Sequence, residues 1–122
     1  MANSSKNKGD AAEREAAALL TELLGTQVRR KLGAGRTNDA GGDTGDLEGV
    51  AGFALQVASW KDTSAAAIQK PLGAEEQRIN AGCEHAATLV RFRGGTWRVV
   101  MTPEQFAAIA QIVISHYAKP AY

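Results

Sequence analysis

The chain has 122 residues, of which 44% are hydrophobic and 22% are charged, and its formal net charge is +1. These values fit one soluble globular domain over residues 1–122, with frayed ends at 1–7 and 118–122, and they do not describe a strongly basic protein. No apolar run approaches the ~18 residues of a membrane helix, and the lone Cys83 excludes an internal disulfide framework, so we expect a cytoplasmic protein without a membrane partner.

The first half of the chain predicts one helix followed by short strands. Apolar residues recur at three-to-four spacing over residues 9–24, which predicts a helix, and Gly25 follows where a left-handed cap favours glycine. Residues 26–31 predict a short strand. The glycine-rich segment 33–49 predicts an irregular loop that contains a brief strand around 46–47.

The second half predicts strands that surround another helix. Residues 52–60 form a near-continuous apolar run, which is typical of a strand covered on both faces. Residues 63–81 predict a helix, and Pro71 marks the point where it could break. Residues 86–92 and 96–101 then predict two strands joined in a hairpin.

The last helix has a clear start signal. Thr102 suits the N-cap, Pro103 the first turn and Gln105 the capping box. Its inward-facing residues are expected to be Phe106, Ile109, Val113 and Tyr117. The element order is therefore α-β-β-β-α-β-β-α, which predicts an α/β fold with a mixed β-sheet flanked by helices.

Charged residues of opposite sign occupy adjacent windows. Four basic residues lie within positions 29–36, and four acidic residues lie within 39–48. This arrangement suits a protein that holds phosphates with one surface and a metal ion with the other. Solvated loop charges are the open alternative.

Three oxygen-bearing side chains are candidates for metal chemistry: Glu13, Asp46 and Gln56. Hydrolysis of a phosphodiester uses a hard divalent cation, and Mg²⁺ is bound by one or two carboxylates with other oxygen ligands. Gln56 interrupts an apolar strand, where an unpartnered amide costs about 1–3 kcal/mol, so it requires a ligand or a polar network. Asp43 competes with Asp46 as the loop ligand, and the spacing to Gln56 favours Asp46.

An ordered set of short segments extends this pattern. In chain order these are Lys8-Gly9, Glu13-Arg14-Glu15, Gly25-Thr26-Gln27-Val28-Arg29-Arg30, Gly33-Ala34-Gly35, Gly45-Asp46-Leu47 and Ala54-Leu55-Gln56-Val57. On these segments, over residues 6–62, the chain resembles the archaeal and phage Holliday junction resolvases of the PD-(D/E)xK nuclease superfamily.

The resemblance implies a restriction-endonuclease-like core and a metal-dependent, structure-specific DNA endonuclease of recombination and repair. It further implies a homodimer that cleaves four-way junctions or other branched DNA, in a bacterial or phage-infected cell, leaving 5′-phosphate and 3′-hydroxyl ends. Catalysis would involve Glu13, Asp46 and Gln56. Mg²⁺ or Mn²⁺ would be bound by these three side chains and by the backbone carbonyl of Val57. The expected DNA contacts are Lys8, Arg29, Arg30, Lys31, Gly35, Arg36, Ser59, Trp60 and Lys61.

Two positions depart from the family pattern. Gln56 replaces the usual glutamate, which keeps an oxygen ligand and removes a charge. Ala58 stands where the family has the lysine that helps to position or activate the attacking water, and alanine does neither. Lys61 points to the other face of a regular strand, so it substitutes only if a bulge intervenes.

Ala58 leaves several explanations open. They are an engineered substitution, a naturally inactive homologue, and a base relocated to Lys61. The alternative functions are accordingly an inactive protein that binds branched DNA, or another PD-(D/E)xK nuclease of nicking or restriction type.

Overall fold

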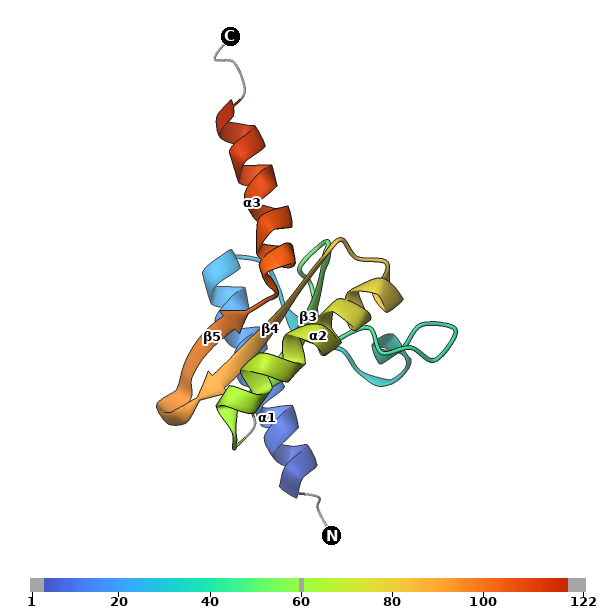
Figure 1. The fold of residues 1–122 in the computed structure, drawn as a ribbon. Helices are drawn as coiled ribbons and strands as arrows, with labels where there is room; N and C mark the ends of the chain where they lie inside the picture. The colour runs from blue at the N-terminus through green and yellow to red at the C-terminus, as the bar shows by residue number, and fades with distance from the viewer. Residues whose placement is uncertain (1–3, 60, 119–122) are drawn as a thin grey trace.

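The chain folds into a five-stranded mixed sheet with helices on its faces, which confirms the α/β class and the expected order of helices and strands (Figure 1). The computed structural model describes residues 4–59 and 61–118, with side chains for all of these except 4–8 and 34. Its elements are α1 (Ser4–Leu24), β1 (Arg29–Arg30), η1 (Gly33–Arg36), β2 (Leu47–Glu48), β3 (Phe53–Ala58), α2 (Thr63–Ala81), β4 (His85–Phe92), η2 (Arg93–Gly95), β5 (Thr96–Val100) and α3 (Pro103–Ala118).

The strands follow chain order across the sheet, β1-β2-β3-β4-β5. Strands β3 and β4 are parallel and are joined through α2, whereas the other neighbours are antiparallel. Strands β1 and β2 have only two residues each, so they are shorter than a typical strand. Strand β2 pairs with β3 at Leu47 and Leu55, and no other described residues form a strand along the second half of β3 on that edge.

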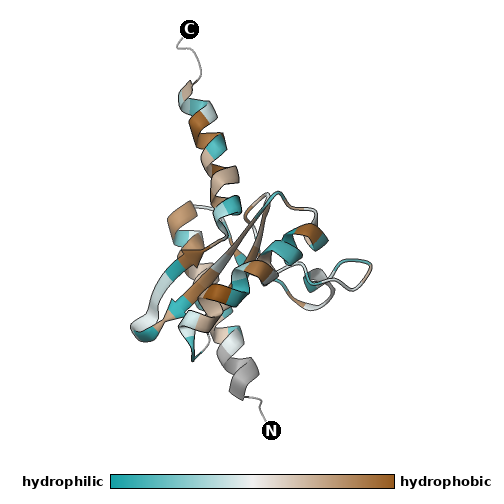
Figure 2. Cartoon of the chain, in the orientation of Figure 1, coloured by the Kyte–Doolittle hydropathy of each residue, from teal (hydrophilic) through white to brown (hydrophobic). Residues whose placement is uncertain are grey.

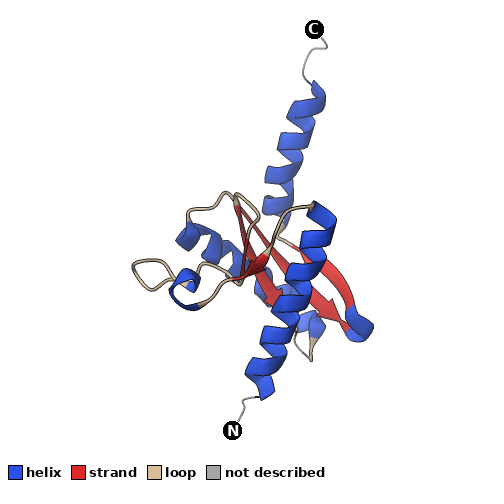
Figure 3. Ribbon diagram, turned by 180° about the vertical axis from the view of Figure 1, so that it is seen from behind, coloured by secondary structure: helices blue, strands red, loops and turns tan. Residues whose placement is uncertain are grey.

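Helices α1 and α2 cover opposite faces of the sheet, as the front and rear views show (Figures 1 and 3). Leu55 and Val57 belong to the core packed on α1, whereas Ala58 packs on Ala66 of α2. Side chains alternate between the faces of a strand, so Gln56 faces α2 together with Ala58.

Helix α2 continues without a break through the buried Pro71, although proline offered a breaking point. Its ends are well capped: the Asp62 side chain accepts a hydrogen bond from the Ala65 amide at 3.0 Å, and Gly82 adopts a left-handed φ of 69°. Proline removes one hydrogen bond of the helical ladder, and the caps and the packing of α2 on the sheet maintain the helix around it.

Helix α3 starts as expected and then leaves the sheet. Thr102 Oγ1 accepts a hydrogen bond from the Gln105 amide at 3.1 Å, and Gln105 Nε2 lies 2.7 Å from His85 Nδ1 of β4. The expectation that Phe106, Val113 and Tyr117 face inward is wrong, since they are 64%, 50% and 82% exposed, whereas Ile109 is half-buried. The helix extends away from the sheet, so none of the described strands packs against its later turns (Figures 1 and 2).

The start of α1 and the lengths of the helices bear on two further predictions from the sequence, namely where the first helix begins and whether any helix could span a membrane. Helix α1 begins at Ser4, five residues earlier than its apolar stripe indicates, because the polar first turns carry no such stripe. Among the described residues, no helix combines the length and the apolar character required to span a membrane.

Candidate functional site

Glu13 and Asp46, which are far apart in the sequence, meet at one guanidinium group. Arg36 Nη2 lies 2.5 Å from Asp46 Oδ1 and 3.3 Å from Glu13 Oε2, and Arg36 Nη1 lies 3.3 Å from Glu13 Oε1. Both acidic residues are only 9% exposed. We call Asp10, Glu13, Arg30, Arg36 and Asp46 the Glu13–Asp46 cluster.

Helix α1 positions Glu13 because this residue lies on the same face as the alanines that pack on the sheet. Glu13 lies one turn before Ala16 and Ala17, which pack on the sheet, so its carboxylate is carried to the edge of the same face. Arg30 of β1 donates from Nε to Glu13 Oε1 at 3.1 Å, and its Nη2 lies 2.9 Å from Asp10 Oδ1. Sequence analysis missed Asp10, although it lies one helical turn before Glu13.

Asp46 is held against β3 by its main chain and its side chain. Its amide donates to the Leu55 carbonyl at 2.7 Å, and its Oδ2 accepts from the Val57 amide at 2.8 Å. Because the N–H and C=O of one strand residue point towards the same neighbour, the Val57 carbonyl also faces the edge where β2 has ended. The structure thus brings the Asp46 carboxylate and the Val57 carbonyl to one edge of β3.

Burial and neighbouring charges shift the pKa values of Asp46 and Arg36. Burial raises the pKa of Asp46, as do the carboxylates of Glu13 and Asp43, against the lowering effects of the Val57 amide and of Arg36. The hydrogen bond to Glu13 is the main cause that raises the pKa of Arg36, and the nearby acidic charges act in the same direction. The guanidinium therefore stays charged and compensates two carboxylates at once.

Gln56 is placed on the other face of β3 from Glu13. Its side chain faces α2, where a Cβ added to Gly73 would lie 3.6 Å from Gln56 Oε1. Gln56 is 7% exposed, and among the described residues its Oε1 has no hydrogen-bond partner, as is also true of Thr88 Oγ1 beside it and of Gln77 Oε1. The structure therefore does not gather Glu13, Asp46 and Gln56 on one face.

Ala58 is part of the packed core on the α2 side. It is 1% exposed and forms a cluster with Ala66 and Val90. The position at which the family pattern has a lysine is thus filled by a methyl group that contacts the helix above it.

Asp43 lies on the α2 side of the loop. Its Oδ2 accepts from Gln77 Nε2 at 3.0 Å, and its backbone carbonyl accepts from Asn80 Nδ2 at 3.0 Å. Asn38 Nδ2 donates to the Asn80 carbonyl at 3.1 Å, which fixes the loop to α2 at a further point. Asp43 therefore binds the loop to the helix, whereas Asp46 faces Arg36.

The expected basic residues near the cluster form the wall of a pocket of about 300 Å³. It is lined by Asp10, Glu13, Arg30, Lys31, Leu32, Gly33 and Arg36. Lys31 Nζ donates to the Thr44 carbonyl at 2.8 Å, and the Gly35 carbonyl accepts from Thr44 Oγ1 at 3.1 Å. Arg29 is exposed and lies 3.5 Å from Glu48. The side chain of Lys8 and the whole of Trp60 lie outside the described residues.

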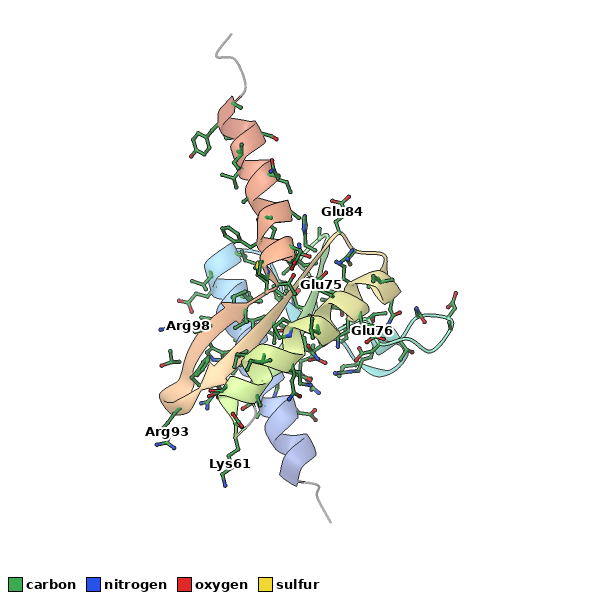
Figure 4. The ribbon with its side chains drawn as sticks, viewed as in Figure 1. Lys61, Glu75, Glu76, Glu84, Arg93 and Arg98 are labelled. Atoms are coloured by element: carbon green, nitrogen blue, oxygen red, sulfur yellow. The ribbon has the colours of Figure 1, made fainter. Side chains whose placement is uncertain are left out.

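Ser59 and Lys61 belong to a different surface. They line a pocket with Thr63, Arg91, Phe92 and Arg93, beyond the end of β3. In Figure 4, Lys61 and Arg93 project near one another, away from Glu76 and Glu84. Lys61 is therefore separate from the pocket beside Glu13, and no strand bulge is needed to explain where it lies.

Within the described residues, no group of three or more His, Cys, Asp or Glu side chains is arranged to hold a metal ion. Comparison of the chain with known protein families, curated proteins and solved structures gives no match. The functional assignment therefore depends on the chemistry of the side chains themselves.

Proposed function

We propose that this protein is a metal-dependent, structure-specific DNA endonuclease, similar to Holliday junction resolvases. The observation that carries the proposal is the meeting of two buried carboxylates, Glu13 and Asp46, at Arg36, beside the main chain of β3 at Val57. Enzymes that hydrolyse phosphodiesters use oxygen donors to hold a metal ion and fixed cations to stabilise the negative charge that builds up on the phosphate.

The oxygen donors fit a hard divalent cation. Asp46 supplies a carboxylate, and the Val57 carbonyl faces the open edge of β3. These two groups would hold Mg²⁺ or Mn²⁺, which when bound would polarise the phosphate and make a coordinated water more acidic, whereas Gln56, the third ligand expected from the sequence, faces α2. Glu13 orients Arg30 and Arg36 and shares the negative charge of the site.

The basic side chains suit a DNA backbone. Arg30, Lys31 and Arg36 surround a pocket large enough for a phosphate group, and Lys61 with Arg93 offers a second cationic surface beside the β4–β5 hairpin. Contacts to phosphate fix the register of a protein on DNA without reading its sequence. Two separate basic surfaces are appropriate for branched DNA, in which more than one duplex arm has to be held.

A homodimer belongs to this proposal, because resolution of a four-way junction needs two cuts related by symmetry. Helix α3 offers an apolar surface for it: Ile112 and Ile114 are each 57% exposed and Val113 is 50% exposed. Figure 2 shows these apolar turns on the part of α3 that projects from the sheet. A helix that is apolar on several sides is stable when it is covered.

The proposal is tested by cleavage of a synthetic four-way junction, a flap and a linear duplex, each with Mg²⁺ or with EDTA. Wild-type protein is expected to cleave branched DNA in Mg²⁺ alone, and Asp46→Asn and Glu13→Gln are expected to lose about 100-fold or more in rate. Glu84→Gln removes an exposed acid away from the cluster and serves as the matched control. Equal cleavage by Asp46→Asn, or no binding of any DNA by wild-type protein, contradicts the proposal.

A second function is favoured by the packing of Ala58 on Ala66, which leaves strand β3 without a cation. In this alternative the protein binds branched DNA and does not cleave it. Junction binding by wild-type protein, with cleavage seen only after Ala58→Lys, selects this second function over the first.

A further inference from the structure

Strands β3 and β4 end at the same end of the sheet, and basic residues gather there. The two strands are parallel neighbours with Ala58 opposite Val90, so the segments that follow them leave the sheet close together. Lys61 lies in the segment after β3, and Arg93 lies in η2, directly after β4. Strand β5 returns antiparallel to β4 and pairs Arg98 with Val90. Three cations from separate segments of the chain are thus carried to one end of the sheet.

Two adjoining pockets join these cations into one surface. The first, of about 330 Å³, is lined by Ser59, Lys61, Thr63, Arg91, Phe92 and Arg93. The second, of about 440 Å³, is lined by Thr63, Phe92, Arg93, Thr96 and Arg98. Because the pockets share three residues, they form one continuous surface, which we call the hairpin surface. Its serine and threonine hydroxyls, like its cations, are groups that commonly contact the phosphates of DNA.

The cations of the hairpin surface are not balanced by ion pairs. Lys61, Arg93 and Arg98 are exposed, and none of them forms an ion pair with another described residue. The neighbouring Asp62 uses its carboxylate to cap helix α2. Figure 4 shows the three cations on the side of the β4–β5 hairpin, away from the labelled glutamates. The surface therefore has uncompensated positive charge, which attracts a polyanion.

Helix α1 separates the hairpin surface from the Glu13–Asp46 cluster. Glu15 follows Glu13 by two residues, and residues at this spacing do not share one side of a helix. Glu13 faces the cluster, whereas Glu15 Oε1 accepts a hydrogen bond from Trp97 Nε1 at 2.8 Å and lies 3.2 Å from Arg91 Nε. Both of these partners belong to the β4–β5 hairpin. A phosphate beside Glu13 and a phosphate on the hairpin surface would therefore lie on different sides of α1.

We propose that the hairpin surface binds the sugar–phosphate backbone of a second duplex arm, and that this contact makes the protein prefer branched DNA to linear duplex. The inference rests on the proposed nuclease function, in which the pocket beside Glu13 holds the phosphate that is cut. A linear duplex in that pocket runs along one axis, whereas a branch point sends another arm in a second direction, towards the far side of α1. Contacts to phosphate read no bases, so the preference is for the shape of the DNA.

The test compares binding of a synthetic four-way junction with binding of a linear duplex that has the sequence of one arm. Fluorescence anisotropy is measured at several salt concentrations, with Ca²⁺ in place of Mg²⁺. The triple variant Lys61→Gln, Arg93→Gln and Arg98→Gln is expected to lose at least about tenfold in junction affinity. Its slope of log affinity against log salt should become shallower by about 2–3, since each phosphate contact contributes about 0.9. Its affinity for the linear duplex should change by less than about threefold, because the duplex does not reach this surface.

Two controls separate charge from structure. The combination of Lys61→Arg, Arg93→Lys and Arg98→Lys keeps every charge and should keep the junction preference. Arg78→Gln removes a cation from the distant half of α2, where Glu75 is its partner, and should leave both affinities unchanged. If the triple glutamine variant does not fold, Arg93→Gln alone serves the comparison, with a salt slope shallower by about 1.

A wild-type junction preference in the glutamine variant overturns the inference, and so do equal losses of affinity for junction and duplex. Loss of the preference in the charge-preserving variant overturns it too, as does a wild-type protein that binds both DNAs equally well. In each of these cases, cleavage of DNA by wild-type protein in Mg²⁺ leaves the nuclease standing. If wild-type protein binds neither DNA, the proposed function itself is wrong.

Discussion

Arg36 allows the site to be tested without a nuclease assay, because it occupies the space between two buried carboxylates. Arg36→Met keeps much of the stem and leaves Glu13 and Asp46 without their shared partner. Removal of one member of a fully buried ion pair costs about 3–5 kcal/mol. The Arg36 side chain is 33% exposed and Glu13 keeps Arg30, so we expect a smaller loss in EDTA, about 2–3 kcal/mol.

A divalent cation should reverse this loss. An ion present at about 100 times its Kd stabilises the folded state by about 2.7 kcal/mol, which is close to the expected cost of the substitution. In wild-type protein the ion has to compete with Arg36, so Mg²⁺ or Mn²⁺ should stabilise Arg36→Met more than wild type.

The assay is urea unfolding in EDTA and at increasing Mg²⁺ and Mn²⁺. Arg78→Met, whose ion pair with Glu75 is partly exposed, should lose less than about 1 kcal/mol and gain no metal dependence. The reasoning is refuted if Arg36→Met is as stable as wild type in EDTA. It is equally refuted if divalent ions stabilise the two proteins to the same extent.

Three further predictions follow from the buried polar groups and from α3. Burial raises the pKa of Asp46, so its contribution to folding stability is complete below the ordinary carboxyl range and is lost as pH rises through the raised pKa. The stability of Asp46→Asn relative to wild type should therefore increase from about pH 4 to pH 7, and a constant difference in denaturant unfolding would contradict this cause. Gln56→Met removes a buried oxygen that has no donor among the described residues, so it should be as stable as wild type or more stable by about 1 kcal/mol in denaturant unfolding. A large loss of stability would instead assign Gln56 a structural role. Ile112→Glu should convert a dimer to a monomer in light scattering, and an unchanged mass would exclude this turn of α3 from the interface.

The sequence predicts the regular elements well where the signal is local. The Thr102 cap, the Gly25 turn and the apolar run of β3 depend on neighbouring residues, and all three are found in the structure. The outward path of α3 is different, because no short-range signal states whether a sheet surface extends beneath an amphipathic helix. The apolar residues Phe106, Val113 and Tyr117 were expected to be buried, and the structure leaves them exposed.

The sequence singled out Glu13 and Asp46, which the structure brings together, but it did not predict that Arg36 joins them. The spacing to Gln56 singled out Asp46, and the structure holds Asp46 at Val57, one residue further along β3. The bridge through Arg36 depends on how a glycine-rich loop folds back on α1, which the sequence pattern does not encode.

The most direct measurement is anomalous X-ray diffraction from crystals of the wild-type protein soaked in Mn²⁺. We expect one strong peak at about 2.0–2.2 Å from an Asp46 carboxylate oxygen, with the Val57 carbonyl among its ligands and Arg36 moved away from Asp46. Crystals that bind Mn²⁺ only elsewhere, or that keep Arg36 on both carboxylates at saturating Mn²⁺, would contradict the assignment of this cluster as a catalytic metal site.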